Sequence, residues 1–250
     1  MYKIELENVC VVYESPQVEG AKSASLITAA DGISTCFNSG DLVGVIGRNG
    51  AGKSTLLSLL AGNLSPQRGV IKVKGERLAL INRSTGLIPK ATLAENAKLK
   101  GYSFGLKGVE LSDFVSKAFE YSKLGSRAES RLNSLSRGMA GRFNIALNSQ
   151  VVKPITILDE WVGTLDVSGK EGNSLLNRLA EDADIVILAS HNQHLIKQLC
   201  NRVILMEQGT IFYDGTDVKE AFKLLSMIKK INDDNQLSAA ELKERLSSGN

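Results

Sequence analysis

The sequence predicts an α/β fold with a parallel sheet at its centre, an N-terminal antiparallel β portion and a helical subdomain at about residues 87–150. Short apolar runs such as "DLVGVIG" and "VILA" are typical of strands that are buried on both faces of a parallel sheet. The first run leads through a glycine-rich turn into a helical pattern. Residues 92–150 carry mainly helical patterns, so they read as an insertion between the strands of the sheet.

Composition limits the class of protein. The 250 residues are 43% hydrophobic, enough for one globular domain or two small ones. The formal charge of +3, from 30 basic and 27 acidic residues, is too balanced to indicate a nucleic-acid partner. Three scattered cysteines, Cys10, Cys36 and Cys200, indicate neither a metal site nor a disulfide framework, which favours a reducing compartment. No apolar run reaches the roughly 20 residues that a membrane helix needs.

The elements follow in order from these patterns. Alternation predicts a first strand at residues 3–13, and the polar residues 14–40 read as a loop plus an irregular strand. A strand at 41–47 precedes a helix at 53–62, and further strands are expected at 69–75 and 77–82. After the helical segment, buried strands are expected at 152–161 and 183–191, and a hairpin at 201–215.

The C-terminal part is expected to be helical. Apolar residues fall on one face of a helix at 218, 221, 222, 225, 228 and 231. Ser238 and Glu241 have the spacing of a capping box, and Leu237 and Leu242 that of a hydrophobic staple, which predicts a short terminal helix. We therefore divide the chain into a domain at 1–236 and a tail at 237–250. A packing role is the default for these helices, and a partner contact is the alternative.

The segment "GRNGAGKST" fits the phosphate-loop pattern G-x-x-x-x-G-K-S/T. Its glycines let backbone N–H groups face phosphate oxygens, and the helix dipole adds to that field. The Lys53 ammonium is expected at the β- and γ-phosphates, and the Ser54 hydroxyl at Mg²⁺. A chance glycine-rich turn is the alternative, but the strand–loop–helix context favours nucleotide binding by a P-loop NTPase core. The loop residues expected at the nucleotide are Gly47, Arg48, Asn49, Gly50, Ala51, Gly52, Lys53, Ser54 and Thr55.

Two other strands end in side chains suited to nucleotide chemistry. "ITILDE" ends in Asp159, which can hold Mg²⁺ through water, and in Glu160, which can polarise the attacking water. Acids at a strand end are ordinary by themselves and become informative downstream of a phosphate loop. "VILASH" ends in His191, where ligands of open α/β sheets gather. The expected catalytic residues are Lys53, Glu160 and His191.

The segment "LSRGM", residues 135–139, has no complete site around it in the sequence. Ser136 and Gly138 form a polar turn just before a helix, and the start of a helix with free N–H groups and a serine hydroxyl is a natural anion site.

These motifs, in this order, resemble the ABC transporter ATPases. "LSRGM" stands where that family has Leu-Ser-Gly-Gly-Gln, "GTLD" matches the D-loop with Asp166, and "ASH" matches the switch histidine. Tyr13 fits the aromatic residue that stacks on adenine, although packing is the ordinary role of such a tyrosine. The resemblance implies an ATPase with ATP and Mg²⁺, in which the signature of one subunit, Ser136 and Gly138, meets the γ-phosphate on a second copy. It also implies a head-to-tail dimer.

The resemblance further implies an integral membrane permease as partner, no nucleic acid, and a peripheral position on the cytoplasmic face of the inner (plasma) membrane. Within the family, Met139 matches exporters of lipid-linked polysaccharides, of the O-antigen, capsule or teichoic-acid type. So do eight residues in register, namely Gly86, Pro89, Thr92, Glu95, Asn96, Leu99, Gly101 and Gly105. The polymer would be handled by the permease.

Two alternatives stay open at this point. One is an exporter of a drug or lipid, and the other is a soluble ABC ATPase that acts on ribosomes or DNA. The chain also departs from the family pattern at two places. Arg137 replaces a small residue of the signature, and Asn82 stands where a glutamine is usual, so Asn82 is a candidate for the contact with Mg²⁺ or water.

Overall fold

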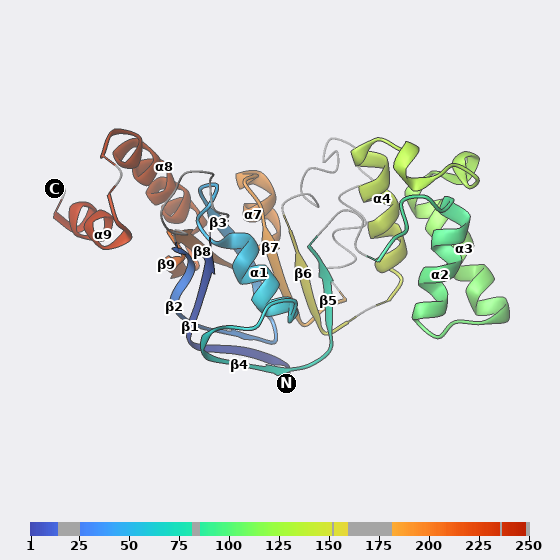
Figure 1. Cartoon of the computed structure of the whole chain (residues 1–250), viewed down its shortest axis with the longest axis horizontal. Helices are drawn as coiled ribbons and strands as arrows, with labels where there is room; N and C mark the ends of the chain where they lie inside the picture. Colours follow the sequence, from blue (N-terminus) through green and yellow to red (C-terminus); the bar gives the residue numbers. More distant parts are fainter. Residues whose placement is uncertain (15–25, 82–85, 152, 160–181, 236, 249–250) are drawn as a thin grey trace.

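The computed structural model describes residues 1–14, 26–81, 86–151, 153–159, 182–235 and 237–248. Its strands form two sheets, one of three strands and one of six, and its helices lie between these sheets, behind the larger sheet and in a separate group at one side (Figure 1). The expected α/β architecture, with an antiparallel β portion and a helical subdomain, is confirmed.

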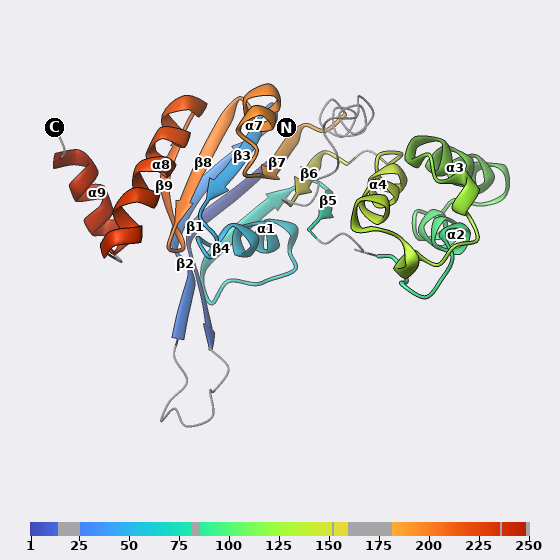
Figure 2. The ribbon, with the colours of Figure 1, turned by 90° about the horizontal axis from the view of Figure 1, so that it is seen from above.

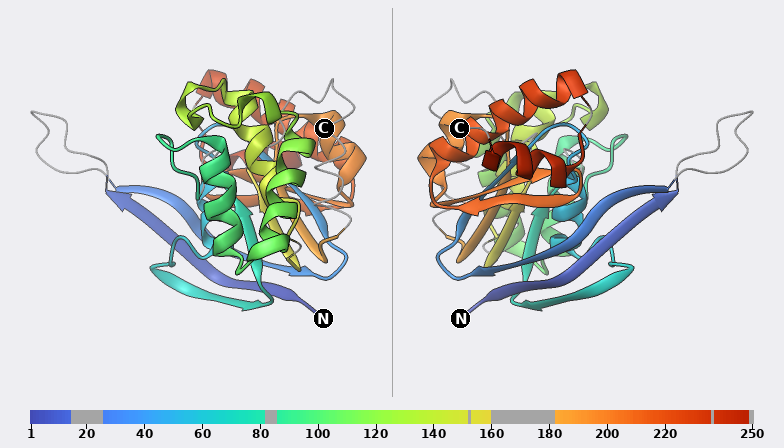
Figure 3. Two further views of the ribbon diagram at one scale, coloured as in Figure 1. Left: turned by 90° about the vertical axis from the view of Figure 1, so that its right-hand side faces the viewer. Right: turned by 90° about the vertical axis from the view of Figure 1, so that its left-hand side faces the viewer.

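The smaller sheet is the antiparallel β portion. It contains β1 (Lys3–Glu14), β2 (Leu26–Asn38) and β4 (Arg68–Lys74) in the order β2-β1-β4. β1 and β2 form a long two-stranded ladder that extends away from the body of the molecule (Figure 3). The sequence predicted an irregular strand for this part of residues 14–40, and the register of β1 against β2 does shift at three places. β2 is longer than its polar sequence suggested. Only its Ala30, Ile33 and Phe37 side chains are fully buried, so its apolar pattern is weak, and its length comes from pairing with β1.

The larger sheet brings the strand ends that carry the predicted site residues to one edge. Its strands are β3 (Leu42–Gly47), β5 (Arg77–Leu80), β6 (Ile155–Leu158), β7 (Ile185–Ala189), β8 (Arg202–Glu207) and β9 (Thr210–Gly215). The order is β5-β6-β7-β3-β8-β9, with all neighbours parallel except the β8–β9 hairpin, which was also predicted. Because parallel strands point the same way, the carboxyl ends of β3, β6 and β7 meet at this edge.

Both faces of the larger sheet are covered, which explains its apolar strands. Along β7, Ile185 and Ile187 pack with one cluster of the core, while Val186 and Leu188 pack with another. Helix α1 (Lys53–Ala61) lies between the two sheets. On the opposite face lie α7 (Gln193–Leu199) and α8 (Val218–Asn235). Burying one leucine side chain contributes about 1.5–3 kcal/mol, so four buried leucines of α1 fix that helix firmly.

Arg202 joins the two sheets at the start of β8. Its guanidinium donates hydrogen bonds to Asp214 on β9 and to the Thr35 hydroxyl and the Cys36 carbonyl on β2. It also donates to Asp41, at 3.1 Å. The hydrogen bond with Asp214 raises the pKa of the Arg202 guanidinium, so this link keeps its charge at any ordinary pH. The two layers are therefore held together by charge as well as by apolar packing.

The helical subdomain is built from α2 (Leu93–Ser103), α3 (Gly108–Ser122) and α4 (Arg137–Asn148), with short 3-10 turns at Gly125–Arg127 and Leu132–Ser134. These helices lie within the range that the sequence predicted. They have their own apolar cluster, centred on Leu93, Phe114 and Phe143. Seen from above, they stand beside the larger sheet, next to β5 and β6 (Figure 2).

The C-terminal helices follow the predicted pattern. α8 presents its apolar face to the larger sheet, and α9 (Ala239–Ser248) begins with the predicted capping box, in which Glu241 N donates to Ser238 Oγ and Ser238 N to Glu241. Leu242 is fully buried, and Gln208 in the β8–β9 turn hydrogen-bonds Leu237 O and Ala239 N. The start of α9 is thus tied to the body. No helix of the described residues has the length and hydropathy needed to cross a bilayer.

Candidate functional site

The loop after β3 has the geometry of an anion cradle. Gly47, Gly50 and Gly52 have φ values of 156°, 80° and 99°. A Cβ on Gly47 would lie 2.4 Å from Met206 O, and one on Gly52 would lie 2.5 Å from Ala29 O, so neither position accepts a side chain without moving backbone. The first turn of α1, which carries Ser54 and Thr55, has no acidic residue and no side-chain cap. That helix start can therefore offer its N–H groups to an anion.

Lys53 lies inside this loop. The residue is only 7% exposed, and its ammonium donates hydrogen bonds of 2.9 Å to both Gly47 O and Arg48 O. Burying an ammonium group is costly unless it is hydrogen-bonded, and these carbonyls supply that compensation. The loop backbone thus holds the Lys53 ammonium at the position where the oxygens of a bound phosphate are expected.

Two neighbouring strands bring further polar groups to the same edge of the sheet. Asp159 follows β6 directly, with its N–H bonded to Leu80 O, and is half-buried. His191 follows β7 by one residue and is exposed. Since β7 pairs with both β3 and β6, these side chains come from strands next to the one that feeds the loop. The structure therefore brings the loop, Asp159 and His191 to one edge, as the sequence predicted.

A cavity of 740 Å³ lies on the outer side of the loop. The loop contributes Arg48 and Asn49, the segment after β7 contributes His191 and Gln193, and one helix forms the other wall. The lining residues of that helix, α8, are Phe222, Leu225, Ser226 and Lys229. The described residues around this cavity include two cations and no carboxylate.

Arg48 is held by a buried acid that the sequence analysis missed. Arg48 Nη1 lies 3.8 Å from Oε1 of Glu207, a residue that is 3% exposed at the end of β8. The available signal was that "RVILME" is an apolar strand that ends in an acid, as "ITILD" is. The sequence also did not predict that α8 lines this cavity. The apolar spacing of that helix indicates that one face packs, but not which neighbour the helix meets.

Tyr13 lies on the β1–β2 ladder next to the loop. It pairs with Ile27, two residues from Ala29, whose carbonyl approaches Gly52. The tyrosine is 43% exposed, so its ring has an open face. This position suits contact with a base as well as it suits packing.

Ser136 and Gly138 are not part of this edge. Ser136 is the N-cap of α4 and accepts a hydrogen bond from Met139 N, and Gly138 lies in the first turn with open space around it. Ser136, Arg137 and Gly138 are all exposed. Both views place α4 beyond β5 and β6, on the far side from α1 (Figures 1 and 2). The "LSRGM" turn is therefore an exposed helix start that does not face the loop of its own chain.

Three predicted site residues, Asn82, Glu160 and Asp166, lie outside the described residues. Their predicted contacts with Mg²⁺, water and nucleotide stay predictions.

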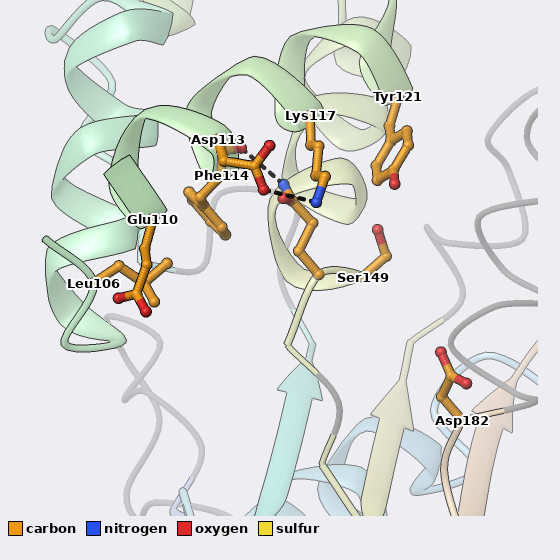
Figure 4. Close-up of a pocket in the computed structure, with 9 residues that line it drawn as sticks. Leu106, Glu110, Asp113, Phe114, Lys117, Tyr121, Ser149 and Asp182 are labelled. Atoms are coloured by element: carbon orange, nitrogen blue, oxygen red, sulfur yellow. Dashed lines mark hydrogen bonds and ion pairs between the residues drawn. The ribbon is translucent and has the colours of Figure 1, made fainter. Parts of the chain in front are cut away.

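A second cavity, of 620 Å³, lies in the helical subdomain (Figure 4). Glu110 and Asp113 of α3 line it, with Lys117 bonded to Asp113 at 2.7 Å, and Ser149 and Asp182 lie across from them. None of the phosphate-loop residues lines it, so it is separate from the loop.

Comparisons with known proteins identify the family. The sequence profile described as ABC transporter matches residues 30–163, more than half of the chain. The chain belongs to the ABC transporter family. It is 33% identical over 193 residues to the O-antigen export system ATP-binding protein RfbE of Yersinia enterocolitica, covering 77% of this chain and 81% of that relative. It is 29% identical over 218 residues to the teichoic acids export ATP-binding protein TagH of Bacillus anthracis, covering 86% of this chain but only 39% of TagH.

Solved structures agree on the fold of this ABC protein. One is an ATP-binding cassette in a dimeric, post-hydrolysis state bound to ADP and Pi, with a TM-score of 0.70, 21% identity, and coverage of 85% of this chain and 98% of that one. At that identity the likeness shows the fold alone. The family profile and the export relatives make the chain an ATP-binding ATPase subunit of the ABC type.

Proposed function

We propose that the chain binds and hydrolyses ATP at the loop between β3 and α1, and that this drives export of a lipid-linked polysaccharide through a separate membrane permease. The observation that carries the nucleotide site is the buried Lys53 ammonium, held by two loop carbonyls beside an uncapped helix start. The observation that carries the transport reaction is the likeness to ATP-binding proteins of two polymer export systems.

The roles of the individual residues are part of this proposal. The backbone of residues 47–55 holds the phosphates, His191 contacts the γ-phosphate, and the Tyr13 ring stacks on adenine. Glu160 orients the attacking water, and Asp166 lies at the nucleotide across the dimer interface. The chain is also proposed to divide into a cassette at 1–236 and a tail at 237–250.

The side chains near the loop fit Mg²⁺. Ser54 at the start of α1 and Asp159 at the end of β6 are oxygen donors, which this hard cation prefers. Among the described residues no cluster of three or more His, Cys, Asp or Glu side chains forms a metal cage. Mg²⁺ is commonly held by one or two protein oxygens plus substrate phosphates, so the donor set suits it. We expect Asn82 to contribute through its amide oxygen.

Each ATP site is proposed to need two copies of the chain. Ser136 and Gly138 form an exposed helix start on α4, which lies beyond β5 and β6, on the far side from α1. In a head-to-tail dimer this helix start would face the γ-phosphate on the second subunit, where N–H groups and the serine hydroxyl can bind it.

The permease is proposed to dock on the helical subdomain. Ile88, Leu99 and Tyr102 on and just before α2 are each about half exposed, at 50%, 48% and 56%. An exposed group of large apolar side chains is typical of an interaction surface. We propose that the chain, docked there, lies on the cytoplasmic face of the inner membrane.

Dimerisation tests the shared site. The Glu160→Gln variant is expected to retain ATP and to form an ATP-dependent dimer that sedimentation velocity detects. Adding Gly138→Asp places a carboxylate against the γ-phosphate, so the double variant should bind ATP and stay monomeric. Gly125→Asp, in another turn of the subdomain with equally open space, is the matched control and should still dimerise. Equal dimerisation of the Gly138→Asp and Gly125→Asp proteins would refute the shared site.

Reconstitution tests the export reaction. The chain is purified with its membrane subunit, placed in lipid vesicles, and assayed for ATP turnover with and without the lipid-linked polymer. Stimulation by the polymer, lost on changing Leu99 and Tyr102 to Ser, supports the proposal. Stimulation by a drug or simple lipid instead would show a different cargo, and ATP turnover that neither the membrane subunit nor any lipid-linked polymer changes would refute a role in transport.

A further inference from the structure

The cavity between the phosphate loop and α8 extends beyond the residues that the motifs assign. Its inner wall is the start of the loop, Arg48 and Asn49, and its side is His191. Its outer wall is a helix near the C-terminus of the chain. The position next to the start of the loop and to His191 is where the outermost phosphate of a bound nucleotide is expected under the function proposed above.

The lining residues of α8 are fixed in place by the core. Phe222, Leu225, Ser226 and Lys229 have the i, i+3, i+4, i+7 spacing of one helix face. Leu225 is 4% exposed and the neighbouring Ile228 is fully buried in the cluster behind the larger sheet. Ser226 and Lys229 follow directly after these anchors, so their Cα positions beside the loop are set by apolar packing.

The charges of the cavity are not equivalent. Arg48 is paired with the buried Glu207, which offsets much of its charge and fixes its direction. The Lys229 ammonium forms no hydrogen bond or ion pair with a described residue, and its side chain lines the cavity. Lys229 is therefore the cation there whose charge is available to a ligand.

We propose that Lys229, together with the Ser226 hydroxyl, binds the outermost phosphate of the nucleotide, so that α8 distinguishes a triphosphate from a diphosphate. A diphosphate held by the same loop lacks the group that extends toward this wall. The contact between α8 and the loop through this phosphate therefore exists with a bound triphosphate and is absent with a bound diphosphate.

The test compares two neighbouring lysines of α8. Lys229→Met keeps the length and apolar character of the stem and removes the charge. Lys230→Met makes the same change one residue further along, on a different face of the helix. Equilibrium binding of a non-hydrolysable ATP analogue and of ADP is measured by calorimetry at a concentration where the chain is monomeric. Lys229→Met is expected to lower the affinity for the ATP analogue by about fivefold, the effect of one partly exposed charge pair, and to leave the affinity for ADP unchanged. Lys230→Met should change neither, and Lys229→Arg should retain the triphosphate preference.

Several results would overturn the proposal. Equal triphosphate affinities in the Lys229→Met and Lys230→Met proteins would exclude a phosphate contact, as would an equal loss for ADP. Normal monomer affinity combined with weaker ATP-dependent dimerisation would show that the cavity receives a second copy of the chain. If the parent protein bound neither nucleotide, the proposed function itself would fail. Binding by the parent with no effect of Lys229→Met would refute only the role of α8.

Discussion

Replacing Lys53 by alanine is the sharpest test of the loop. In the structure the Lys53 ammonium bonds two carbonyls of the loop at 2.9 Å, and the residue is 7% exposed. Lys53→Ala removes both the charge and the stem that fills the loop. The nucleotide then loses its central cation, and the carbonyls of Gly47 and Arg48 lose their donor. We expect nucleotide affinity to fall while the fold is retained.

The magnitude follows from the kind of contact. A hydrogen bond that involves a charged group contributes about 1.5–3 kcal/mol. Loss of one such contact to the phosphates should therefore lower ATP affinity by about ten- to 150-fold. Loss of the buried stem acts on stability instead, at about 0.8 kcal/mol for each buried CH₂ group. Lys53→Met keeps most of the stem, so it should lose affinity to the same extent and be destabilised less.

The assay is equilibrium binding of ATP, with thermal unfolding followed by circular dichroism as a check on the fold. Lys74→Ala, at an exposed lysine of β4, is the matched control and should bind ATP as the parent does. If folded Lys53→Ala and Lys53→Met proteins bound ATP with parental affinity, the loop would not be the phosphate site.

Three further predictions follow from the same structure. Glu160→Gln should bind ATP and lose at least about a hundredfold in turnover, since a general base contributes about that much; near-normal phosphate release would contradict its role. A chain that ends at residue 236 should keep ATP turnover but lose about 1.5–3 kcal/mol of unfolding free energy in urea, because Leu242 no longer covers the core; a folded but inactive truncation would argue for a tail-dependent site. Burial raises the pKa of the Cys200 thiol from 9.0 to about 12. The unfolded thiol therefore ionises first, stability should fall as pH rises above 9.0, and Cys200→Ala should remove that part of the fall.

The sequence predicted the central sheet well, because its strands are buried on both faces. Runs such as "ITIL" and "IVILA" are short and rich in β-branched residues, which favours a buried strand over a helix. The capping box at Ser238 was equally readable, since the pattern depends on residues only three apart. The phosphate loop and the positions of Asp159 and His191 followed from the strand ends.

The rest depended on contacts between distant parts of the chain. The length of β2 is set by pairing with β1, and its polar sequence gives little sign of that pairing. The pairing of Arg48 with Glu207 joins residues 159 positions apart, so no local pattern could place them together. The wall that α8 forms beside the loop has the same cause, because apolar spacing shows which face of a helix is buried but not which neighbour it meets.

The turn between β8 and β9 touches the phosphate loop as well as α9. Gly209 N donates to Ala51 O at 3.0 Å, while Gln208 in the same turn bonds the start of α9. A backbone amide that donates to a carbonyl exchanges its hydrogen with solvent only when that bond opens. The exchange rate of the Gly209 amide in heavy water therefore measures how often the loop separates from the turn. This native amide therefore reports on loop opening without any attached label.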